Sequence, residues 1–458
     1  MAPKFGTSGL RGLVVDLTEA LVTDYTRAFL AACSHGGAVH VGRDLRPSSP
    51  QIADWVIAAV RDAGLTAVNC GALPTPALAL SSLNASCAAV MVTGSHIPAD
   101  RNGLKFYVPS GEISKADETA IGAALGRGPQ GLSGGIETKQ ALDDYLARYI
   151  RAYGRALEGV VVGVYQHSSV ARDAMVQVFE GLGARVVSIA RSETFIPVDT
   201  EALDPETQAL FAGWFAEHGL DVLMSTDGDA DRPMVVDDKA RVVPGDVLGA
   251  LTARGLGARV ICTPVSSNTM VSQMGFDRVT LTKIGSPYVI AAMEEALAAD
   301  PQAHVVGYEA NGGFLLGFEA QGPQGLLLPL MTRDCLLPMI APLAAARAEG
   351  VTLSALVDAL PPRFTAADRL QGIETEKSKA FLAELSAFAD ARAAFFGETE
   401  TVLDQADGLR ATFADGYVIH LRPSGNAPEF RCYAESDSRE AAMALMRATL
   451  EKVQARLG

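Results

Sequence analysis

The sequence predicts an α/β fold with three successive α/β domains, mixed sheets between helices, and a C-terminal α+β domain, around a central cleft. Two observations predict it. A strand–helix rhythm runs three times along the chain, and the tail after residue 362 is rich in strands. The 458 residues suffice for several domains with separate cores. We expect the domains at residues 1–150, 151–252, 253–365 and 366–458.

The first three domains follow from apolar runs that alternate with helical segments. In the first, a strand at 38–42 precedes a helix that begins at Ser49-Pro50 and ends near Gly64. The second has predicted strands at 160–165, 184–189 and 221–226, with helices near 169–182 and 205–218. The third has predicted strands at 258–263, 277–282 and 304–309, with a helix near 286–299. The strand runs are apolar throughout, which is typical of sheets covered by helices on both faces.

The fourth domain has a different order of elements. The predicted elements are a helix near 376–389, short strands near 400–413, strands at 417–421 and 429–435, and a closing helix from Ser438. Neighbouring strands followed by a helix indicate an α+β domain.

Composition and charge exclude several classes of protein. Hydrophobic residues make up 48% and charged residues 20%, a globular balance that excludes disorder and fibrous folds. The net charge of −15 argues against binding to nucleic acid or to an anionic membrane. No apolar run reaches the length of about 18 residues needed to span a membrane. The start MAPKFGTSGLRG lacks the apolar core of a signal peptide, so we expect a cytoplasmic protein. The six cysteines are scattered without a CxxC pair, so we expect reduced thiols.

Three aspartates alternate in the motif DGDADRP, directly after a predicted strand: Asp227, Asp229 and Asp231. Residues two apart do not share a helix face, so this spacing indicates a loop that directs three oxygen ligands at one cation. Carboxylate oxygens are ligands that Mg²⁺ prefers. The alternative is a solvated acidic turn. An EF-hand fits poorly because its sixth and twelfth positions, normally Gly and Glu, are Arg232 and Asp238.

A second loop places Ser95 after the apolar run AAVMV, with His96 beside it and Lys105 on the next strand. A serine at the carboxyl end of a strand, next to basic side chains, is suited to carry a phosphoryl group. The GxSxG motif of hydrolases is absent, since Thr93 and Ile97 replace its glycines. Taken alone, such a serine is more often a turn residue, and such a histidine is more often a surface or hydrogen-bonded side chain.

Two further loops carry polar groups, although glycine-rich loops after strands are common and the first of them is a weak signal by itself. In GYEANGGF, the carboxylate of Glu309 and the amide of Asn311 are suited to neighbouring hydroxyls. The loop RPSGNAPEFR predicts a phosphate cradle, with a Pro/Gly hairpin turn as the alternative. The cradle residues are Arg422, Ser424, Gly425, Asn426 and Arg431. No Walker motif or complete GxGxxG motif occurs, which argues against a nucleotide substrate.

In this order, the four loops resemble the active-site loops of the α-D-phosphohexomutases, the phosphomannomutase and phosphoglucomutase family, over nearly the whole chain. FGTSGLRG at 5–12 resembles the amino-terminal signature of the family, TGSHIP its phosphoserine loop and DGDADR its magnesium loop. The sugar loop departs from many bacterial members, because Asn311 and Gly313 stand where those members have Ser and His. That histidine is a candidate proton-transfer group. Ile97, Asn426 and Ala427 also replace frequent family residues.

The resemblance implies a phosphotransferring isomerase of carbohydrate metabolism, a phosphomannomutase-like enzyme that interconverts hexose 6-phosphate and hexose 1-phosphate. Mannose is the expected hexose, with glucose as a second. The reaction would pass through a phosphoserine and a hexose 1,6-bisphosphate, which also acts as activator, with one Mg²⁺ per chain. The implied catalytic residues are Ser95, Lys105, His96 and Arg11, and the implied metal ligands are Ser95, Asp227, Asp229 and Asp231. The implied substrate-binding residues are Arg232, Lys283, Glu309, Asn311, Arg422, Ser424, Gly425, Asn426 and Arg431.

Two other functions stay open. One is a mutase that prefers glucose or glucosamine phosphate, and the other is a sugar-phosphate-binding protein without turnover. In each case we expect a sugar phosphate as the partner, no nucleic acid or membrane partner, and a monomer or homodimer.

Overall fold

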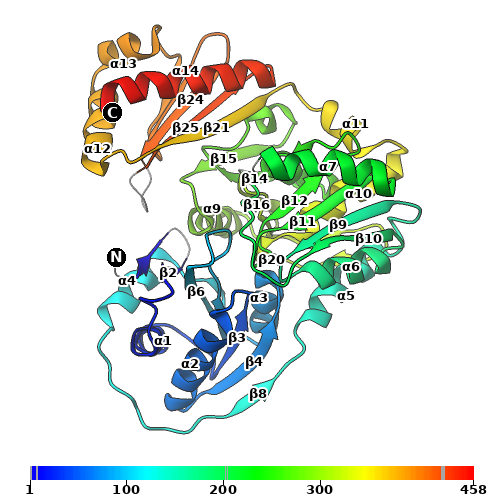
Figure 1. Ribbon diagram of the computed structural model, residues 1–458, viewed down its shortest axis with the longest axis vertical. Helices are drawn as coiled ribbons and strands as arrows, with labels where there is room; N and C mark the ends of the chain where they lie inside the picture. Colours follow the sequence, from blue (N-terminus) through cyan, green and yellow to red (C-terminus); the bar gives the residue numbers. More distant parts are fainter. Residues whose placement is uncertain (1–2, 7–8, 202, 204, 424–428) are drawn as a thin grey trace. The chain divides into compact units, whose positions relative to one another are not determined.

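The computed structural model describes residues 3–6, 9–201, 203, 205–423 and 429–458 (Figure 1). Contacts divide the chain into two compact units. The larger unit is Met1–Arg259 with Gly285–Val357, and the smaller unit is Val260–Ile284 with Asp358–Gly458. Within the described ranges, no helix is both long and apolar enough to cross a membrane.

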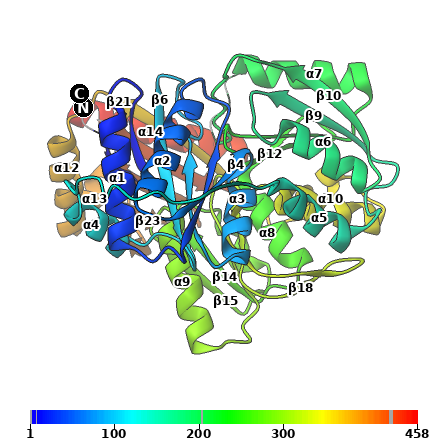
Figure 2. The same ribbon diagram turned by 90° about the horizontal axis from the view of Figure 1, so that it is seen from below.

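The first sheet of the larger unit carries the serine loop. Its strand order is β1-β2-β6-β5-β3-β4-β8, with β7 paired to β6. The strands are β1 (Lys4–Phe5), β2 (Leu10–Leu13), β3 (Ala38–Arg43), β4 (Thr66–Ala72), β5 (Ala88–Val92), β6 (Arg101–Val108), β7 (Gly111–Glu112) and β8 (Ile136–Thr138). Helices α1 (Glu19–Ala32) and α2 (Ser49–Asp62) cover one face and α3 (Thr75–Asn84) the other (Figure 2). Because both faces are covered, every residue of the apolar run in β5 is buried.

The second sheet of the larger unit carries the aspartate motif. Its order is β10-β9-β11-β12-β13, parallel from β10 to β11 and antiparallel from β11 to β13. The strands are β9 (Val161–His167), β10 (Arg185–Arg191), β11 (Val222–Thr226), β12 (Pro233–Val236) and β13 (Val242–Val243). Helices α6 (Arg172–Gly181) and α7 (Pro205–His218) contact strands of this sheet, and α5 (Leu142–Tyr153) contacts α6. Helix α8 (Gly245–Gly255) follows β13 along the chain, whereas α4 (Lys115–Ala123) contacts α1 beside the first sheet. Thr226 pairs with Pro233, so the motif forms the tight connection between β11 and β12.

The rest of the larger unit carries the sugar loop. Strands β16 (Val305–Tyr308), β17 (Phe314–Leu316) and β20 (Leu330–Asp334) pair antiparallel. The remaining elements are α9 (Ser286–Ala299), the hairpin β18 (Ala320–Gln321) and β19 (Leu326–Leu327), α10 (Leu336–Glu349) and α11 (Leu353–Asp358), whose last residue belongs to the smaller unit. The motif GYEANGGF spans the turn between β16 and β17, which places its polar residues at one end of the sheet.

The smaller unit contains the antiparallel sheet β21-β25-β24-β23-β22 and the parallel pair β14 and β15. Its strands are β14 (Val260–Pro264), β15 (Arg278–Thr282), β21 (Phe364–Gln371), β22 (Val402–Asp404), β23 (Leu409–Thr412), β24 (Val418–Pro423) and β25 (Glu429–Ser436). Its helices are the 3₁₀ turn η1 (Thr269–Gln273), α12 (Thr375–Ala387), α13 (Ala389–Phe396) and α14 (Arg439–Leu457). The predicted start of the last helix is confirmed, because the Ser438 side chain accepts a hydrogen bond from the Ala441 amide.

The predicted fold class, three α/β domains and a strand-rich C-terminal domain, is confirmed. The domain boundaries stay predictions. One expectation is wrong: β10 and β15, although apolar in sequence, are largely exposed or half-buried. Both strands lie at a sheet edge, where helices cover them less completely than a central strand.

Candidate active site

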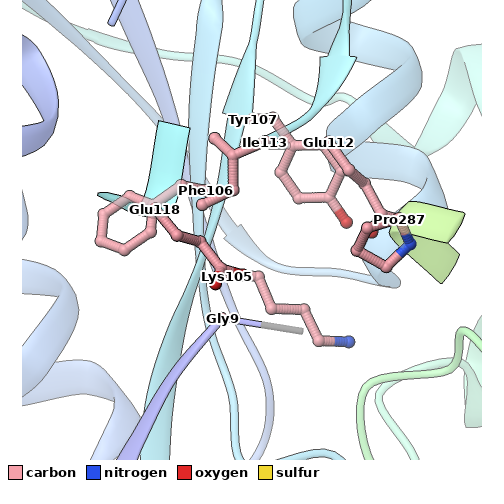
Figure 3. Close-up of a pocket in the computed structure, with 8 residues that line it drawn as sticks. All are labelled: Gly9, Lys105, Phe106, Tyr107, Glu112, Ile113, Glu118 and Pro287. Atoms are coloured by element: carbon pink, nitrogen blue, oxygen red, sulfur yellow. The ribbon is translucent and has the colours of Figure 1, made fainter. Parts of the chain in front are cut away.

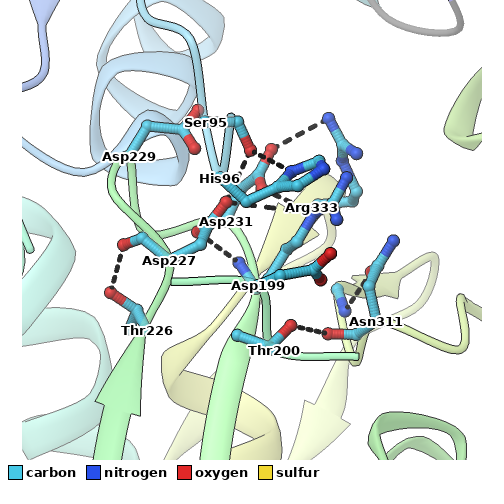
Figure 4. A network of polar contacts seen from close by, with 12 residues as sticks. Ser95, His96, Asp199, Thr200, Thr226, Asp227, Asp229, Asp231, Asn311 and Arg333 are labelled. Carbon is cyan, nitrogen blue, oxygen red and sulfur yellow. Dashed lines mark hydrogen bonds and ion pairs between the residues drawn. The ribbon is translucent and has the colours of Figure 1, made fainter. Parts of the chain in front are cut away.

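Ser95 meets the aspartate motif inside the larger unit. Its Oγ donates a hydrogen bond to Asp227 Oδ2 at 2.6 Å and lies 3.3 Å from His96 Nδ1 (Figure 4). The serine is 1% exposed, and its backbone φ of 55° is left-handed. The structure thus brings the hydroxyl, the histidine and the first aspartate together, although 132 residues separate Ser95 from Asp227.

Two arginines hold the serine loop. Arg11 Nη1 donates to the carbonyl of Gly94 at 2.6 Å, and burial lowers the pKa of Arg11 to about 10. Arg46, which the sequence analysis missed, donates to the carbonyls of Ser95 at 2.8 Å and Pro98 at 2.7 Å. It is fully buried beside Asp44. A Cβ at Gly94 would lie 2.5 Å from Arg46 Cζ, so the glycine makes room for this side chain.

The three aspartates form a buried cluster. Asp227, Asp229 and Asp231 are each 0% exposed, and one carboxylate oxygen from each lies within 4.8 Å of the others. The alternative of a solvated acidic turn is therefore wrong. Burial raises the pKa of Asp227 well above its usual value, and the two neighbouring carboxylates raise it further. Three buried carboxylates this close repel one another, which favours a bound cation.

Neighbouring side chains bind one oxygen of each of two aspartates. Lys105 Nζ donates to Asp229 Oδ2 and Asp231 Oδ2, both at 2.6 Å, and Thr75 Oγ1 donates to Asp229 Oδ2 at 2.8 Å. Burial would raise the pKa of Asp229, but Lys105 and Thr75 outweigh it, and the pKa lies below its usual value. The second oxygen of each, Asp229 Oδ1 and Asp231 Oδ1, accepts no hydrogen bond from the described residues. Buried carboxylate oxygens in this state fit the hard-oxygen coordination of Mg²⁺.

The candidate proton-transfer groups differ in their surroundings. Burial lowers the pKa of His96, and the positive charges of Arg232 and Arg11 lower it further, so the imidazole stays uncharged near neutral pH. An uncharged ring nitrogen 3.3 Å from Ser95 Oγ is able to accept a hydrogen bond, but the lowered pKa makes it a weak base. Lys105, by contrast, is bound to two carboxylates and lines a small pocket with Tyr107 and Glu112 (Figure 3).

The sugar loop is a compact turn whose hydrogen bonds are mostly its own. The Glu309 amide donates to the Gly313 carbonyl at 3.2 Å, and the Gly313 amide donates to Asn311 Oδ1 at 3.0 Å. Glu309 is 4% exposed, and burial raises the pKa of its carboxyl while Arg333 lowers it. Its Oε2 accepts no hydrogen bond from the described part of the chain, so this carboxylate retains an acceptor for a ligand.

Two more arginines lie beside these carboxylates. Arg232, expected to bind substrate, places its Nε 3.9 Å from Asp227 Oδ2 and 3.8 Å from Asp231 Oδ1. Arg333, which the sequence analysis missed, binds Asp231 Oδ2 at 2.8 Å through Nη2. No motif surrounds Arg333 in the sequence, and its position on β20 becomes meaningful only in the folded chain.

The phosphate-cradle residues belong to the smaller unit. Arg422 Nε donates to Asp407 Oδ1 at 2.8 Å, and Arg431 Nη2 lies 3.6 Å from Glu429 Oε2. Lys283 is exposed, and the amide that follows it, at Ile284, donates to Asp407 Oδ2 at 2.9 Å. Asp407 therefore links the Lys283 segment to Arg422 within this unit. The predicted cradle residues Ser424, Gly425 and Asn426 lie outside the described residues.

Comparison with known proteins gives full-length matches. The sequence matches four families described as Phosphoglucomutase/phosphomannomutase: alpha/beta/alpha domain I over residues 2–132, domain II over 144–240, domain III over 244–364 and the C-terminal domain over 371–452. It is 44% identical to a phosphomannomutase of Sinorhizobium fredii, covering 97% of this chain and 98% of that protein. It is 42% identical to a phosphomannomutase of Salmonella muenchen, covering 99% of this chain and 96% of that protein. The fold is similar to that of a Phosphoglucomutase/phosphomannomutase family protein of Burkholderia thailandensis, with a TM-score of 0.76, 21% identity and coverage of 98% and 97%.

Proposed function

The chain belongs to the phosphoglucomutase/phosphomannomutase family and is a phosphotransferring isomerase, and we propose that it interconverts mannose 6-phosphate and mannose 1-phosphate. The resemblance inferred from the four loops is thereby confirmed. One observation carries the proposed chemistry: a buried serine hydroxyl lies 2.6 Å from a carboxylate of a buried aspartate cluster. The choice of mannose rests on the two relatives above 40% identity.

Ser95 is the proposed phosphate carrier. The bond between Ser95 Oγ and phosphorus breaks as the free hydroxyl oxygen of the bound hexose monophosphate forms a new bond to phosphorus. The hydroxyl proton passes to a base, for which His96 and Lys105 are the candidates. The product is a hexose 1,6-bisphosphate. After it turns over in the site, its other phosphate returns to Ser95, and free bisphosphate serves as the activator.

Asp227, Asp229, Asp231 and the Ser95 phosphate would hold one Mg²⁺, which supplies positive charge for the transferring phosphoryl group. Two cationic side chains of the chain would assist. Arg11 holds the serine loop through the Gly94 carbonyl. Arg232 lies beside two of the aspartates and is placed to bind an anionic substrate.

Two parts of the chain would bind the sugar ring and the second phosphate of the substrate. Glu309 and Asn311 present a carboxylate and an amide to the hydroxyls of the sugar ring. Residues of the smaller unit would bind whichever phosphate is not reacting. The proposed phosphate ligands are Lys283, Arg422, Ser424, Gly425, Asn426 and Arg431.

The test is a mass measurement combined with turnover. Intact protein and the peptide containing Ser95 should gain the mass of one phosphate after incubation with a hexose 1,6-bisphosphate. Ser95→Ala should lose this label and nearly all mutase activity, whereas Ser86→Ala, a change at the exposed turn before β5, should lose neither. Chelation of divalent ions should stop turnover. An unlabelled wild-type Ser95, or full activity in Ser95→Ala, would refute the covalent scheme.

Turnover measurements on the same protein sample identify the preferred substrate. Mannose 1-phosphate, glucose 1-phosphate and glucosamine 1-phosphate are compared by kcat/KM, with mannose expected to be highest. A higher value for glucosamine phosphate would make the enzyme a phosphoglucosamine mutase. Binding of all three without turnover would indicate an inactive sugar-phosphate-binding protein.

A further inference from the structure

We propose that Arg333 is a positioning residue that ties the metal-site carboxylate of Asp231 to the sugar-loop carboxylate of Glu309; this inference rests on the proposed function. Arg333 lies on β20, and its side chain is 5% exposed. Its Nη2 lies 2.8 Å from Asp231 Oδ2 (Figure 4). Its Nη1 lies 3.6 Å from Glu309 Oε2. One planar guanidinium thus lies between two sites with different proposed tasks.

The contact with Asp231 selects which oxygen is left for a cation. Arg333 and Lys105 both bind Asp231 Oδ2, so Asp231 Oδ1 remains without a hydrogen bond from the described residues. Partners of a metal ligand fix its orientation in this way, and their loss typically lowers metal affinity or activity about 10- to 100-fold.

The contact with Glu309 acts differently. At 3.6 Å, Arg333 Nη1 offsets the negative charge of the carboxylate, yet Glu309 Oε2 accepts no hydrogen bond from the described residues. A buried carboxylate whose charge is offset by an arginine, and which still has an oxygen available as acceptor, is suited to bind a sugar hydroxyl. Arg333 therefore offsets the charge of Glu309 without occupying the atom that would bind the ligand.

The neighbouring glycine supports this arrangement. Gly312 has a left-handed φ of 85°, but Gly313 does not have such a conformation, so backbone geometry does not require glycine there. Space does. A Cβ at Gly313 would lie 2.8 Å from Arg333 Cγ and 2.9 Å from Arg333 Cδ. The stem of Arg333 thus passes through the volume that any other side chain at position 313 would need.

Arg333→Lys is the informative variant, because it retains the charge and loses the two-pronged guanidinium. Magnesium binding to the unphosphorylated protein and mannose 6-phosphate binding are measured by calorimetry. We expect both dissociation constants to rise about tenfold or more. In a Glu309→Gln background, the Arg333→Lys penalty on sugar-phosphate binding should fall below threefold, while the penalty on magnesium binding should persist. A sugar-phosphate penalty that is equal in both backgrounds, or magnesium affinity within threefold of wild type, would overturn the proposal.

A second pair of variants tests the space argument and covers the case in which Arg333→Lys folds poorly. Gly313→Ala should weaken both ligands, and it should add less than a threefold effect in an Arg333→Ala background. The control is Gly213→Ala on α7, where a Cβ would meet nothing within 4 Å. Equal behaviour of Gly313→Ala and Gly213→Ala would refute the inference. If wild-type protein neither binds nor converts a hexose phosphate, the proposed function is wrong. The magnesium titrations still test whether Arg333 orients Asp231.

Discussion

Arg46→Lys should loosen the serine loop by about 2–6 kcal/mol, although Arg46 touches neither Ser95 Oγ nor the aspartates. Arg46 donates five hydrogen bonds: one to Asp44 Oδ2 and four to loop carbonyls, those of residues 95, 97, 98 and 101. A lysine ammonium has three donors, so at least two of these five buried acceptors lose their partner. Each buried acceptor left without a partner costs about 1–3 kcal/mol, which gives the range above.

Hydrogen exchange is the suitable assay, because a chain with several domains need not unfold in one step. Amides of residues 93–101 should exchange at least about 30-fold faster in Arg46→Lys, which corresponds to about 2 kcal/mol. The matched control is Arg27→Lys on α1, which alters a partly exposed ion pair with Asp62 at 3.2 Å and should cost less than about 1 kcal/mol. Exchange of 93–101 within threefold of wild type would show that Arg46 does not hold the loop.

Two further predictions concern other parts of the chain. Thr75→Val removes the 2.8 Å hydrogen bond to Asp229 Oδ2 and should weaken magnesium binding about tenfold, as measured by calorimetry. The control is Ser82→Ala on the same helix, whose hydroxyl donates to a helix carbonyl and whose loss should leave magnesium binding unchanged. Equal magnesium affinities of the two variants would contradict the role of Thr75. His420 is 1% exposed, and burial lowers its pKa from 6.5 to about 4, so the unfolded chain takes up a proton that the folded chain does not bind. Stability is therefore lost as the pH falls from about 6.5 towards 4, by about 2 kcal/mol at pH 5. His420→Gln should reduce this loss, as measured by the hydrogen-exchange protection of β24 amides at pH 7 and pH 5. An equal loss of protection in the variant and the wild type would refute the assignment.

The elements were predictable because their signals are local. The helices at 205–218 and 286–299 have the expected bounds, and the strands that were predicted in the three α/β domains lie within a few residues of their predicted ranges. Side-chain periodicity and the Pro and Gly residues at element ends act over short distances and need no tertiary context. The exposure of β10 and β15 was not predictable in this way. Whether a strand lies at the edge or in the centre of a sheet depends on the order of the strands, which is a tertiary property.

The chemical groups of the candidate site were visible in the sequence because Ser95 and the three aspartates stand in dense motifs directly after strands. Their partners were not. Thr75 lies 154 residues from Asp229, Arg46 lies 49 residues from Ser95, and Arg333 stands alone on a short strand. The sequence by itself determined which loops carry the candidate serine and carboxylates, whereas the tertiary structure decided which oxygen of each carboxylate is held and which is left for a ligand. The physical reason is that hydrogen bonds and ion pairs act over a few ångströms in space and do not depend on separation along the chain.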